Sequence, residues 1–474
     1  MRTSLVALAI GLTALWIEGC GGGPASSGAP DGGSTGGGGG TQHAGGTGGT
    51  GGAAGAGGSA GQTTAGSSGT VGTGGGGQAG SGGASGTGGR AGRGGTTGAA
   101  GQSGAGGAAA AAGTTGAGGR GGSATGGAAG TPASLDTARL MAPGWNLGNS
   151  FDASPNETSF GNPTPSQTLI NGVHAAGFKT LRIAVTWTNH IGSGPAYTID
   201  SAWMNKVKQT AQWAVDAGMY VFVNTHHEAD GNGGWVTFPQ MSAATGVAAE
   251  VTAVWTQIAN AFKTFNSHLM LECFNEPNEA GGGNTPQAQA DLNLYLEACV
   301  NAIRGTGGAN ATRTVMIQPV GASPIQAGIQ SMQQASIIND PNLVISLHTY
   351  YPTIFGLSTT PYAWGSASDY TDMQNSIAQQ IRVWLPNQII FIGEWGSMAA
   401  QAAANRAAHA QAYAQDTTTA GLIPIWWDNG GSGSSSFSLF NRNTGAVTQP
   451  DIVNGIMTGV RNGLAAPNSW ATHP

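Results

Sequence analysis

After Thr131 the chain alternates between short apolar runs and longer segments with helical periodicity, and this alternation limits the possible folds more than any other feature. Eight runs are predicted to be β-strands, at 144–149, 178–185, 219–226, 268–275, 313–320, 342–350, 388–395 and 422–427. Eight strand–helix units over about 340 residues favour a closed barrel of parallel strands over an open doubly wound sheet. We therefore predict an α/β fold, a (β/α)8 TIM barrel, for residues 131–474.

The segments between the runs carry apolar residues three and four positions apart, as one buried face of a helix requires. In the first of them, Thr164 is the expected N-cap and Gln167 the partner that closes a capping box. Pro165 then occupies the first helical position, and Gly177 ends the helix. Further helices are predicted at 201–217, 246–265, 287–304, 324–334, 368–384, 401–419 and 450–462.

Residues 21–130 have a composition that excludes a packed core. They consist almost entirely of Gly, Ala, Ser and Thr and contain most of the 85 glycines of the chain. Such a segment cannot bury enough apolar surface to offset the entropy lost on ordering. We expect a disordered linker whose ends lie roughly 50 to 60 Å apart. It is either a spacer between the cell surface and a working domain or a passive insertion.

Residues 1–20 have the pattern of an export signal, with Arg2, an apolar run of about a dozen residues and a small residue before Cys20. The run is too short to span a bilayer stably. Ile17, Gly19 and Cys20 fit a lipoprotein signal and Glu18 fits it poorly, so Cys20 is a candidate lipid anchor. Ordinary cleavage with full secretion is the alternative. In both cases we expect an extracellular or cell-surface protein.

The composition also limits the partners. Only 8% of the residues are charged and the formal net charge is -6, so no basic surface for nucleic acid is expected. Apart from Cys20 the chain has two cysteines, Cys273 and Cys299, whose spacing matches no metal-site pattern. They either pair in an oxidising compartment or stay as buried free thiols. We expect a monomer that needs no cofactor.

Side chains alternate between the two faces of a strand, which predicts the ones that point into the barrel. In 178–185 the apolar set is Leu181, Ile183 and Val185, which should face the helices. Arg182 then points inward, and we expect it to pair with Glu272 deep in the barrel. The same alternation directs a further set of side chains inward, namely Ala184, Thr186, Asn224, His226, Ser346, His348 and Tyr350.

Two glutamates, Glu276 and Glu394, end two strands that are not neighbours in the chain. The alternation places Glu276 on the face of Glu272, and Glu394 on the face of Ile390 and Ile392. Glycoside cleavage needs one carboxylic acid to protonate the leaving oxygen and one carboxylate to attack or to activate water. A separation of about 5 to 5.5 Å between the carboxyl groups implies a covalent intermediate and retention of configuration. A structural ion pair is the alternative role.

Seven segments lie in register with one known family: "GWNLGNSFDA", "LRIAVTW", "NTHHE", "FNEPNE", "HTYYP", "IGEWG" and "WWDNG". In order and in strand position they resemble the motifs of glycoside hydrolase family 5 endoglucanases, over residues 140–460. A lone Asn-Glu-Pro tripeptide would be a weak signal, whereas seven segments in register are a strong one. The resemblance implies the barrel and a glycosidase.

The resemblance also implies roles for individual residues. Glu276 looks like the general acid/base and Glu394 like the nucleophile. Asn275 would bind the 2-hydroxyl group of the sugar. Arg182 and Tyr350 would donate hydrogen bonds to the nucleophile and keep it ionised.

Histidines and tryptophans complete the site that the resemblance implies. His226 and His348 would orient the carboxyl groups and the sugar, with ordinary core histidines as the alternative, and His227 has a less defined role. Trp427 would form the floor under the cleaved unit. Other tryptophans are candidates for either the cleft or the core, namely Trp145, Trp235 and Trp395. The His-His-Glu run at 226–228 lacks the helical spacing of a zinc protease, so no metal is expected.

The combined interpretation is a retaining endo-β-1,4-glucanase that acts on cellulose or a related β-glucan. A β-mannanase or a xyloglucanase of the same family is the alternative within this chemistry. A non-catalytic surface glycan-binding protein is an alternative of another class, although its expected mark, the loss of a catalytic glutamate, is not found. A third reading makes the Gly-rich region a structural matrix module.

Overall fold

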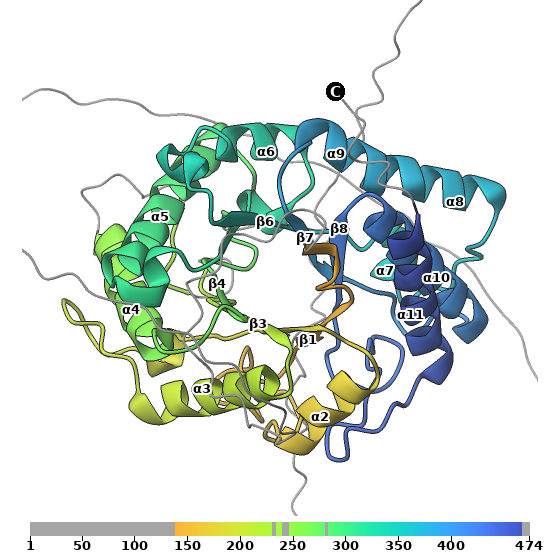
Figure 1. Cartoon of the computed structure of the whole chain (residues 1–474), viewed down its shortest axis with the longest axis horizontal. Helices are drawn as coiled ribbons and strands as arrows, with labels where there is room; N and C mark the ends of the chain where they lie inside the picture. Colours follow the sequence, from red (N-terminus) through yellow and green to blue (C-terminus); the bar gives the residue numbers. More distant parts are fainter. Residues whose placement is uncertain (1–137, 230–233, 239–245, 280–282, 467–474) are drawn as a thin grey trace, which may run out of the picture. The chain divides into compact units, whose positions relative to one another are not determined.

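Eight parallel strands close into a barrel in the order of the chain, each paired with its neighbours in sequence and β8 with β1 (Figure 1). The computed structural model describes residues 138–229, 234–238, 246–279 and 283–466. The strands are β1 (Gly144–Leu147), β2 (Thr180–Ile183), β3 (Tyr220–Asn224), β4 (Leu269–Glu272), β5 (Val315–Ile317), β6 (Leu343–His348), β7 (Ile390–Trp395) and β8 (Leu422–Trp426). The predicted TIM barrel is confirmed, and the open doubly wound sheet is excluded.

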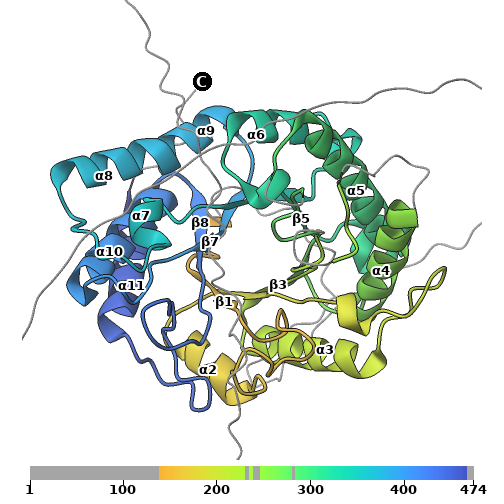
Figure 2. The ribbon, with the colours of Figure 1, turned by 180° about the vertical axis from the view of Figure 1, so that it is seen from behind.

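Helices form a ring outside the strands (Figures 1 and 2). They are α2 (Gln167–Ala175), α3 (Ser201–Asp216), α4 (Gly246–Phe262), α5 (Pro286–Gly305), α6 (Gln326–Met332), α7 (Thr353–Gly356), α8 (Ala367–Met373), α9 (Gln380–Trp384), α10 (Ala403–Thr419) and α11 (Pro450–Ala465). The helix predicted at 368–384 consists of α8, a π-helical segment (Gln374–Gln379) and α9. The short helix α7 was not predicted. None of the described helices is both long and apolar enough to cross a membrane.

The start predicted for α2 is wrong by two residues. Ser166 is the N-cap, in an extended conformation, and its hydroxyl accepts a hydrogen bond from the Leu169 N–H. Thr164 lies immediately before Pro165, and a residue before proline avoids the helical conformation. The predicted capping box with Gln167 is therefore not formed, whereas Gly177 does follow the helix end, with φ +107°.

The predicted division of strand faces holds for β2. Leu181 and Ile183 are fully buried in the main apolar cluster, while Arg182 between them pairs with Glu272 of β4. Phe222 of β3 pairs in register with Arg182 and meets Phe391 of β7 edge to face, with ring centroids 4.9 Å apart. The barrel is thus filled by side chains and carries its polar groups toward the carboxyl ends of the strands.

The face predicted for Glu394 is wrong, because β7 contains a bulge. Ile392 pairs with Leu347 of β6, but the next pair joins Glu394 to His348, so Gly393 is an extra residue. A bulge of one residue reverses the alternation of faces beyond it. Glu394 therefore lies on the side of His348 inside the barrel, opposite to the face of Ile392.

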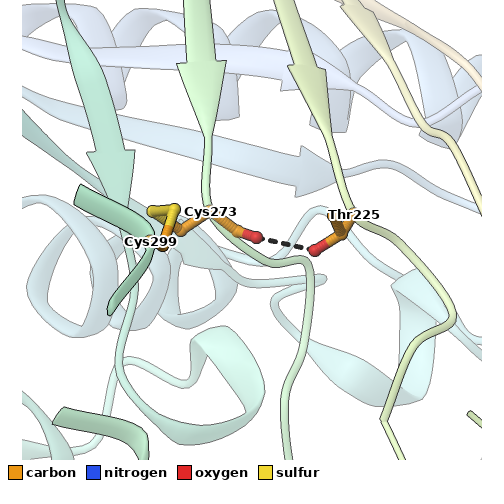
Figure 3. The surroundings of a disulfide bond; sticks show 3 residues. All are labelled: Thr225, Cys273 and Cys299. Atoms are coloured by element: carbon orange, nitrogen blue, oxygen red, sulfur yellow. Dashed lines mark hydrogen bonds between the residues drawn. A yellow bond between two sulfur atoms is a disulfide. The ribbon is translucent and has the colours of Figure 1, made fainter. Parts of the chain in front are cut away.

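Cys273 and Cys299 form a disulfide between the end of β4 and α5 (Figure 3). The sequence analysis left open whether these cysteines pair or stay as free thiols. Both residues are fully buried, and the Cys273 carbonyl accepts a hydrogen bond of 2.6 Å from the Thr225 hydroxyl of the segment after β3. A cross-link over 26 residues of chain stabilises a fold by about 3 kcal/mol in the loop-entropy account. It fastens the strand end that leads to Glu276.

Several predictions concern residues outside the described ones. These are the export signal at 1–20 with its candidate anchor Cys20, the linker at 21–130, and the first residues of the predicted catalytic domain.

Candidate active site

A buried guanidinium lies at the centre of the polar region. Arg182 is fully buried, and its five N–H groups make five hydrogen bonds of 2.7 to 3.2 Å. Nε and Nη2 donate to the two oxygens of Glu272, Nη1 donates to Asn146 Oδ1 and Glu394 Oε1, and Nη2 also donates to Asn275 Oδ1. A buried charge is tolerated only when paired and hydrogen-bonded. Every donor of this group is satisfied.

The two predicted glutamates lie close together. One carboxylate oxygen of each, and a ring nitrogen of His348, all lie within 4.8 Å of one another. His348 Nδ1 is 2.6 Å from Glu276 Oε1 and 3.8 Å from Glu394 Oε2. The side chain of Glu276 is 40% exposed and that of Glu394 is 8% exposed. Solvent therefore reaches the pair from the side of Glu276.

The environments of the two carboxyl groups differ. Burial of its carboxyl group raises the pKa of Glu276 to about 7, although solvent reaches part of the side chain, and no hydrogen bond from a cation opposes this. Burial also raises the pKa of Glu394, but this group accepts hydrogen bonds from Arg182 (2.8 Å) and from the Tyr350 hydroxyl (2.9 Å), which favour its charged form. The arrangement suits a protonated Glu276 beside an ionised Glu394.

Two histidines of the site are neutral at neutral pH. Burial lowers the pKa of His348 to about 4 and the pKa of His226 well below its ordinary value. The Asn224 Oδ1 accepts a hydrogen bond from the Val185 N–H, so its amide nitrogen faces His226 Nδ1 at 3.2 Å. Because Nδ1 accepts there, the proton of His226 is on Nε2. His226 can therefore donate a hydrogen bond from Nε2.

His227 lies beside Asp152, a residue that the sequence interpretation missed. Its Nε2 is 4.0 Å from Asp152 Oδ2, and burial lowers the pKa of His227 to about 4. One ligand atom each of Asp152, His226 and His227 lie within 4.8 Å of one another. Both nitrogens of His226 are already engaged, one by Asn224 and one by its proton, whereas a metal needs a free nitrogen. The donor set thus suits hydrogen bonding better than a metal.

Trp427 forms an apolar wall of the site. It is 5% exposed, and its ring lies parallel to that of His226, with centroids 5.7 Å apart. It forms a cluster with Ala184, Met398 and Phe437, and Tyr350 packs against this cluster. A Cβ atom on Gly148 would lie 2.7 Å from the Trp427 ring, so only glycine allows the chain after β1 to pass there.

Of the other candidate tryptophans, two are core residues. Trp145 is fully buried against Phe440, and Trp395 is fully buried in a parallel stack with Tyr413 of α10 at 4.3 Å. The sequence analysis left cleft and core open for these two, and both lie in the core because they are on the helix-facing side of their strands. Trp235 is half-buried in the segment after β3 and packs against the main apolar cluster.

Asn146 and Glu228 were missed as well. Asn146 donates to the Gly393 carbonyl at 2.8 Å and accepts from Arg182, and its position between apolar Trp145 and Leu147 was the available signal. Glu228 is 1% exposed and accepts hydrogen bonds from the Trp187 N–H and the Thr188 hydroxyl. Burial raises the pKa of Glu228 to about 7. It joins the segments that follow β2 and β3.

Comparisons with known proteins agree with this geometry. The model of the family described as Cellulase (glycosyl hydrolase family 5) matches residues 146–433. Endoglucanase B of Clostridium cellulovorans is 36% identical over 339 residues, which cover 69% of this chain and 76% of that protein.

Solved structures are similar over the barrel. A broad specificity endoglucanase from Clostridium acetobutylicum aligns with TM-score 0.64 and 33% identity, covering 68% of this chain and 99% of that one. A family 5 xyloglucanase from Paenibacillus pabuli aligns with TM-score 0.61 and 31% identity, over 68% and 99% of the two chains. The family model and the similar endoglucanases place this barrel, with its acidic pair at the strand ends, among the glycoside hydrolases. The chain belongs to the cellulase family, glycosyl hydrolase family 5, as the seven sequence motifs predicted.

We expect Gly393→Ala to reduce activity strongly. A Cβ at this position would lie 2.4 Å from Ser346 Oγ and 2.8 Å from His348 Nε2, both buried. His348 would have to move from Glu276, and a shift of about 1 Å in an active site costs on the order of a hundredfold in rate. Steady-state kinetics and thermal unfolding of the variant measure the effect.

Gly305→Ala at the end of α5 is the matched control, because a Cβ there meets no atom within 4 Å. It should leave kcat unchanged. Wild-type kcat in Gly393→Ala would contradict the tight contact between β6 and β7.

Proposed function

We propose that this protein is a retaining endo-β-1,4-glucanase that hydrolyses internal bonds of cellulose or related β-glucans by double displacement. The observation that carries the proposal is the separation of the two carboxylates, whose nearest oxygens are within 4.8 Å. Inverting enzymes keep their carboxyl groups about 6.5 to 9.5 Å apart, because water must fit between one of them and the sugar. The shorter separation supports direct attack by one glutamate.

In the first step Glu394 attacks the anomeric carbon, and the bond from that carbon to the leaving oxygen breaks. Glu276 transfers its proton to that oxygen, which departs as a hydroxyl group. In the second step Glu276, now ionised, takes a proton from water. The resulting hydroxide attacks the anomeric carbon and releases Glu394 as a carboxylate.

The surrounding residues support these roles. Arg182 and Tyr350 hold one oxygen each of Glu394, so its position is fixed before the sugar binds. Asn275 Oδ1 accepts from Arg182, which leaves the amide N–H groups to donate to the sugar 2-hydroxyl. His348 contacts Glu276, and His226 Nε2 offers a further donor. The Trp427 ring suits the apolar face of a pyranose.

The proposal also concerns which polysaccharide the enzyme cleaves. One similar structure is a broad specificity endoglucanase and another is a xyloglucanase, which supports a decorated β-glucan as a substrate beside cellulose. A xyloglucanase or a β-mannanase remains the alternative. A non-catalytic glycan-binding role is disfavoured, because both glutamates are present and Glu276 is accessible.

We further propose that the protein is exported and acts as a monomer outside the cell. The support is the signal pattern of residues 1–20, with Cys20 as the candidate lipid anchor, and the composition of 21–130, which suits a tether for the catalytic domain in 131–474.

Glu276→Gln and Glu394→Gln should each lower kcat on a soluble β-glucan by at least about a thousandfold, because each removes one of the two groups that the displacement needs. Both amides are nearly isosteric with the carboxyl group, so circular dichroism should show an intact fold. Glu297→Gln on α5 is the control, since its carbonyl oxygen still accepts from the Ser336 N–H. Full activity in either active-site variant would refute the assignment.

The activity should decline as the pH rises above about 7. Glu276 must be protonated to donate, and burial raises its pKa to about 7, so the competent form is lost on the alkaline side. The measurement is kcat/KM against pH with an unsubstituted oligosaccharide. An aryl glycoside with a good leaving group needs no acid, and in Glu276→Gln its kcat/KM should lose the alkaline limb. An alkaline limb that persists there would assign the titration to another group.

Release of reducing ends from carboxymethylcellulose, xyloglucan and glucomannan under one set of conditions tests the substrate. We expect the two β-glucans to be cleaved faster than glucomannan, with the β-anomer as first product by NMR. A preference for glucomannan would replace the glucanase by a mannanase, and an α-anomer would exclude the double displacement.

A further inference from the structure

A groove on the helical ring lies outside the site described above. It is a cavity of about 340 Å³ between α8, the start of the π-helical segment, and α10. Figures 1 and 2 both show α8 and α10 side by side on the outside of the barrel. Its polar lining consists of Tyr370, Thr371 and Gln374 on one side and Gln411, Gln415 and Asp416 on the other, with two alanines of α10 between them. The volume falls within the range of small-molecule sites, about 300 to 1,000 Å³.

The groove contains an exposed aromatic ring that is held in place. Tyr370 is 39% exposed, and its ring centroid lies 4.7 Å from that of Trp364. Trp364 is itself buried and meets His409 of α10 edge to face at 5.0 Å. An anchored tyrosine offers contact area with little loss of side-chain entropy, which suits stacking against a flat, partly apolar ligand.

Polar groups without partners converge on the same groove. The carboxylate of Asp416, in the last turn of α10, is half-buried and accepts no hydrogen bond from a side chain of the described residues. Burial raises the pKa of Asp416 to about 6. Among the described residues, the side-chain amides of Gln374 and Gln411 make no hydrogen bond. Gln415 uses only its Oε1, which accepts from the Asn462 amide. The half-buried carboxylate of Asp416 favours a ligand that donates to it, and the exposed amides of Gln374 and Gln411 beside it are free to bond the same ligand.

The charge of the lining limits the class of ligand further. No Lys or Arg lines the groove and one carboxylate does, so phosphate, sulfate and other anions are disfavoured. A chain of neutral sugars carries hydroxyl groups that both donate and accept, together with apolar faces for the ring of Tyr370. The π-helical segment begins at Gln374, and such turns are frequent at functional sites.

We propose that this groove is a second binding site for a β-glucan chain, separate from the catalytic centre. Tyr370 stacks on a glucosyl unit, Asp416 accepts from its hydroxyl groups, and Gln374 and Gln411 bond the neighbouring unit. The ligand class rests on the proposed function, since the groove would hold the polymer that the active site cleaves. Holding one part of the polymer raises the local concentration of the rest at the active site.

Binding is measured with the full chain carrying Glu394→Gln, so that the polymer is not consumed. Affinity electrophoresis in gels that contain xyloglucan or hydroxyethylcellulose gives the dissociation constant. Adding Tyr370→Ala or Asp416→Ala should weaken the binding about threefold to tenfold, while Tyr370→Phe keeps the ring and should retain it. Val383→Ala, exposed on α9 and absent from the lining of the groove, is the matched control and should have no effect.

Kinetics of Tyr370→Ala with an intact active site give the second measurement. KM on the polymer should rise about fivefold with kcat unchanged, and kcat/KM on cellotetraose should equal that of the wild type. Equal losses on polymer and cellotetraose would mean an effect on the catalytic centre and would overturn the proposal.

Two outcomes separate this proposal from the proposed function. Polymer binding that depends on Tyr370, with no hydrolysis by the wild-type protein, would support the groove and refute the glucanase. Hydrolysis of glucans with binding unchanged in both groove variants would refute the groove alone.

A third outcome concerns the ligand of the groove. A rise in Tm with calcium that Asp416→Ala abolishes, without any effect on polymer binding, would show a cation site and would refute the glucan site.

Discussion

The arrangement of the active site depends on the buried guanidinium of Arg182. This cation of β2 joins three other strands, because it bonds Asn146 of β1, Glu272 at the end of β4 and Glu394 of β7. It also bonds Asn275 just beyond β4. Loss of one partner of such a buried group leaves an uncompensated charge, which costs several kcal/mol. The geometry around Glu394 is therefore part of what holds the barrel together, and function and stability share one network.

The same network explains why a bulge in β7 is needed. The helix-facing side of β7 must present Ile390 and Ile392 to the core, and strict alternation would place Glu394 with them. Gly393 adds one residue and turns Glu394 toward Arg182 and His348. The bulge needs glycine, since any Cβ would collide with Ser346 and His348. The bulge thus lets β7 place a carboxylate inside the barrel while its helix-facing side stays apolar.

Within this frame two like groups acquire different properties. Glu394 is held by a cation and a hydroxyl group, whereas Glu276 faces neutral His348 and its pKa is raised to about 7. Two carboxyl groups in unlike environments can divide the roles of acid and nucleophile. The groove around Tyr370 and Asp416 contains no such pair, which suits the binding of a polymer rather than its cleavage.

The sequence by itself determined the barrel, the inward direction of Arg182 and the family. The alternation of faces within a strand and the order of the motifs can both be read directly from the residues. The position of Ser166 as N-cap, the reversed face of Glu394, and the core location of Trp145 and Trp395 were decided by the tertiary structure. So were the pairing of Cys273 with Cys299 and the groove between α8 and α10. Apart from the N-cap, which local bonding to Leu169 sets, each depends on distances between segments far apart in the chain, and those distances exist only after the strands have closed into a barrel.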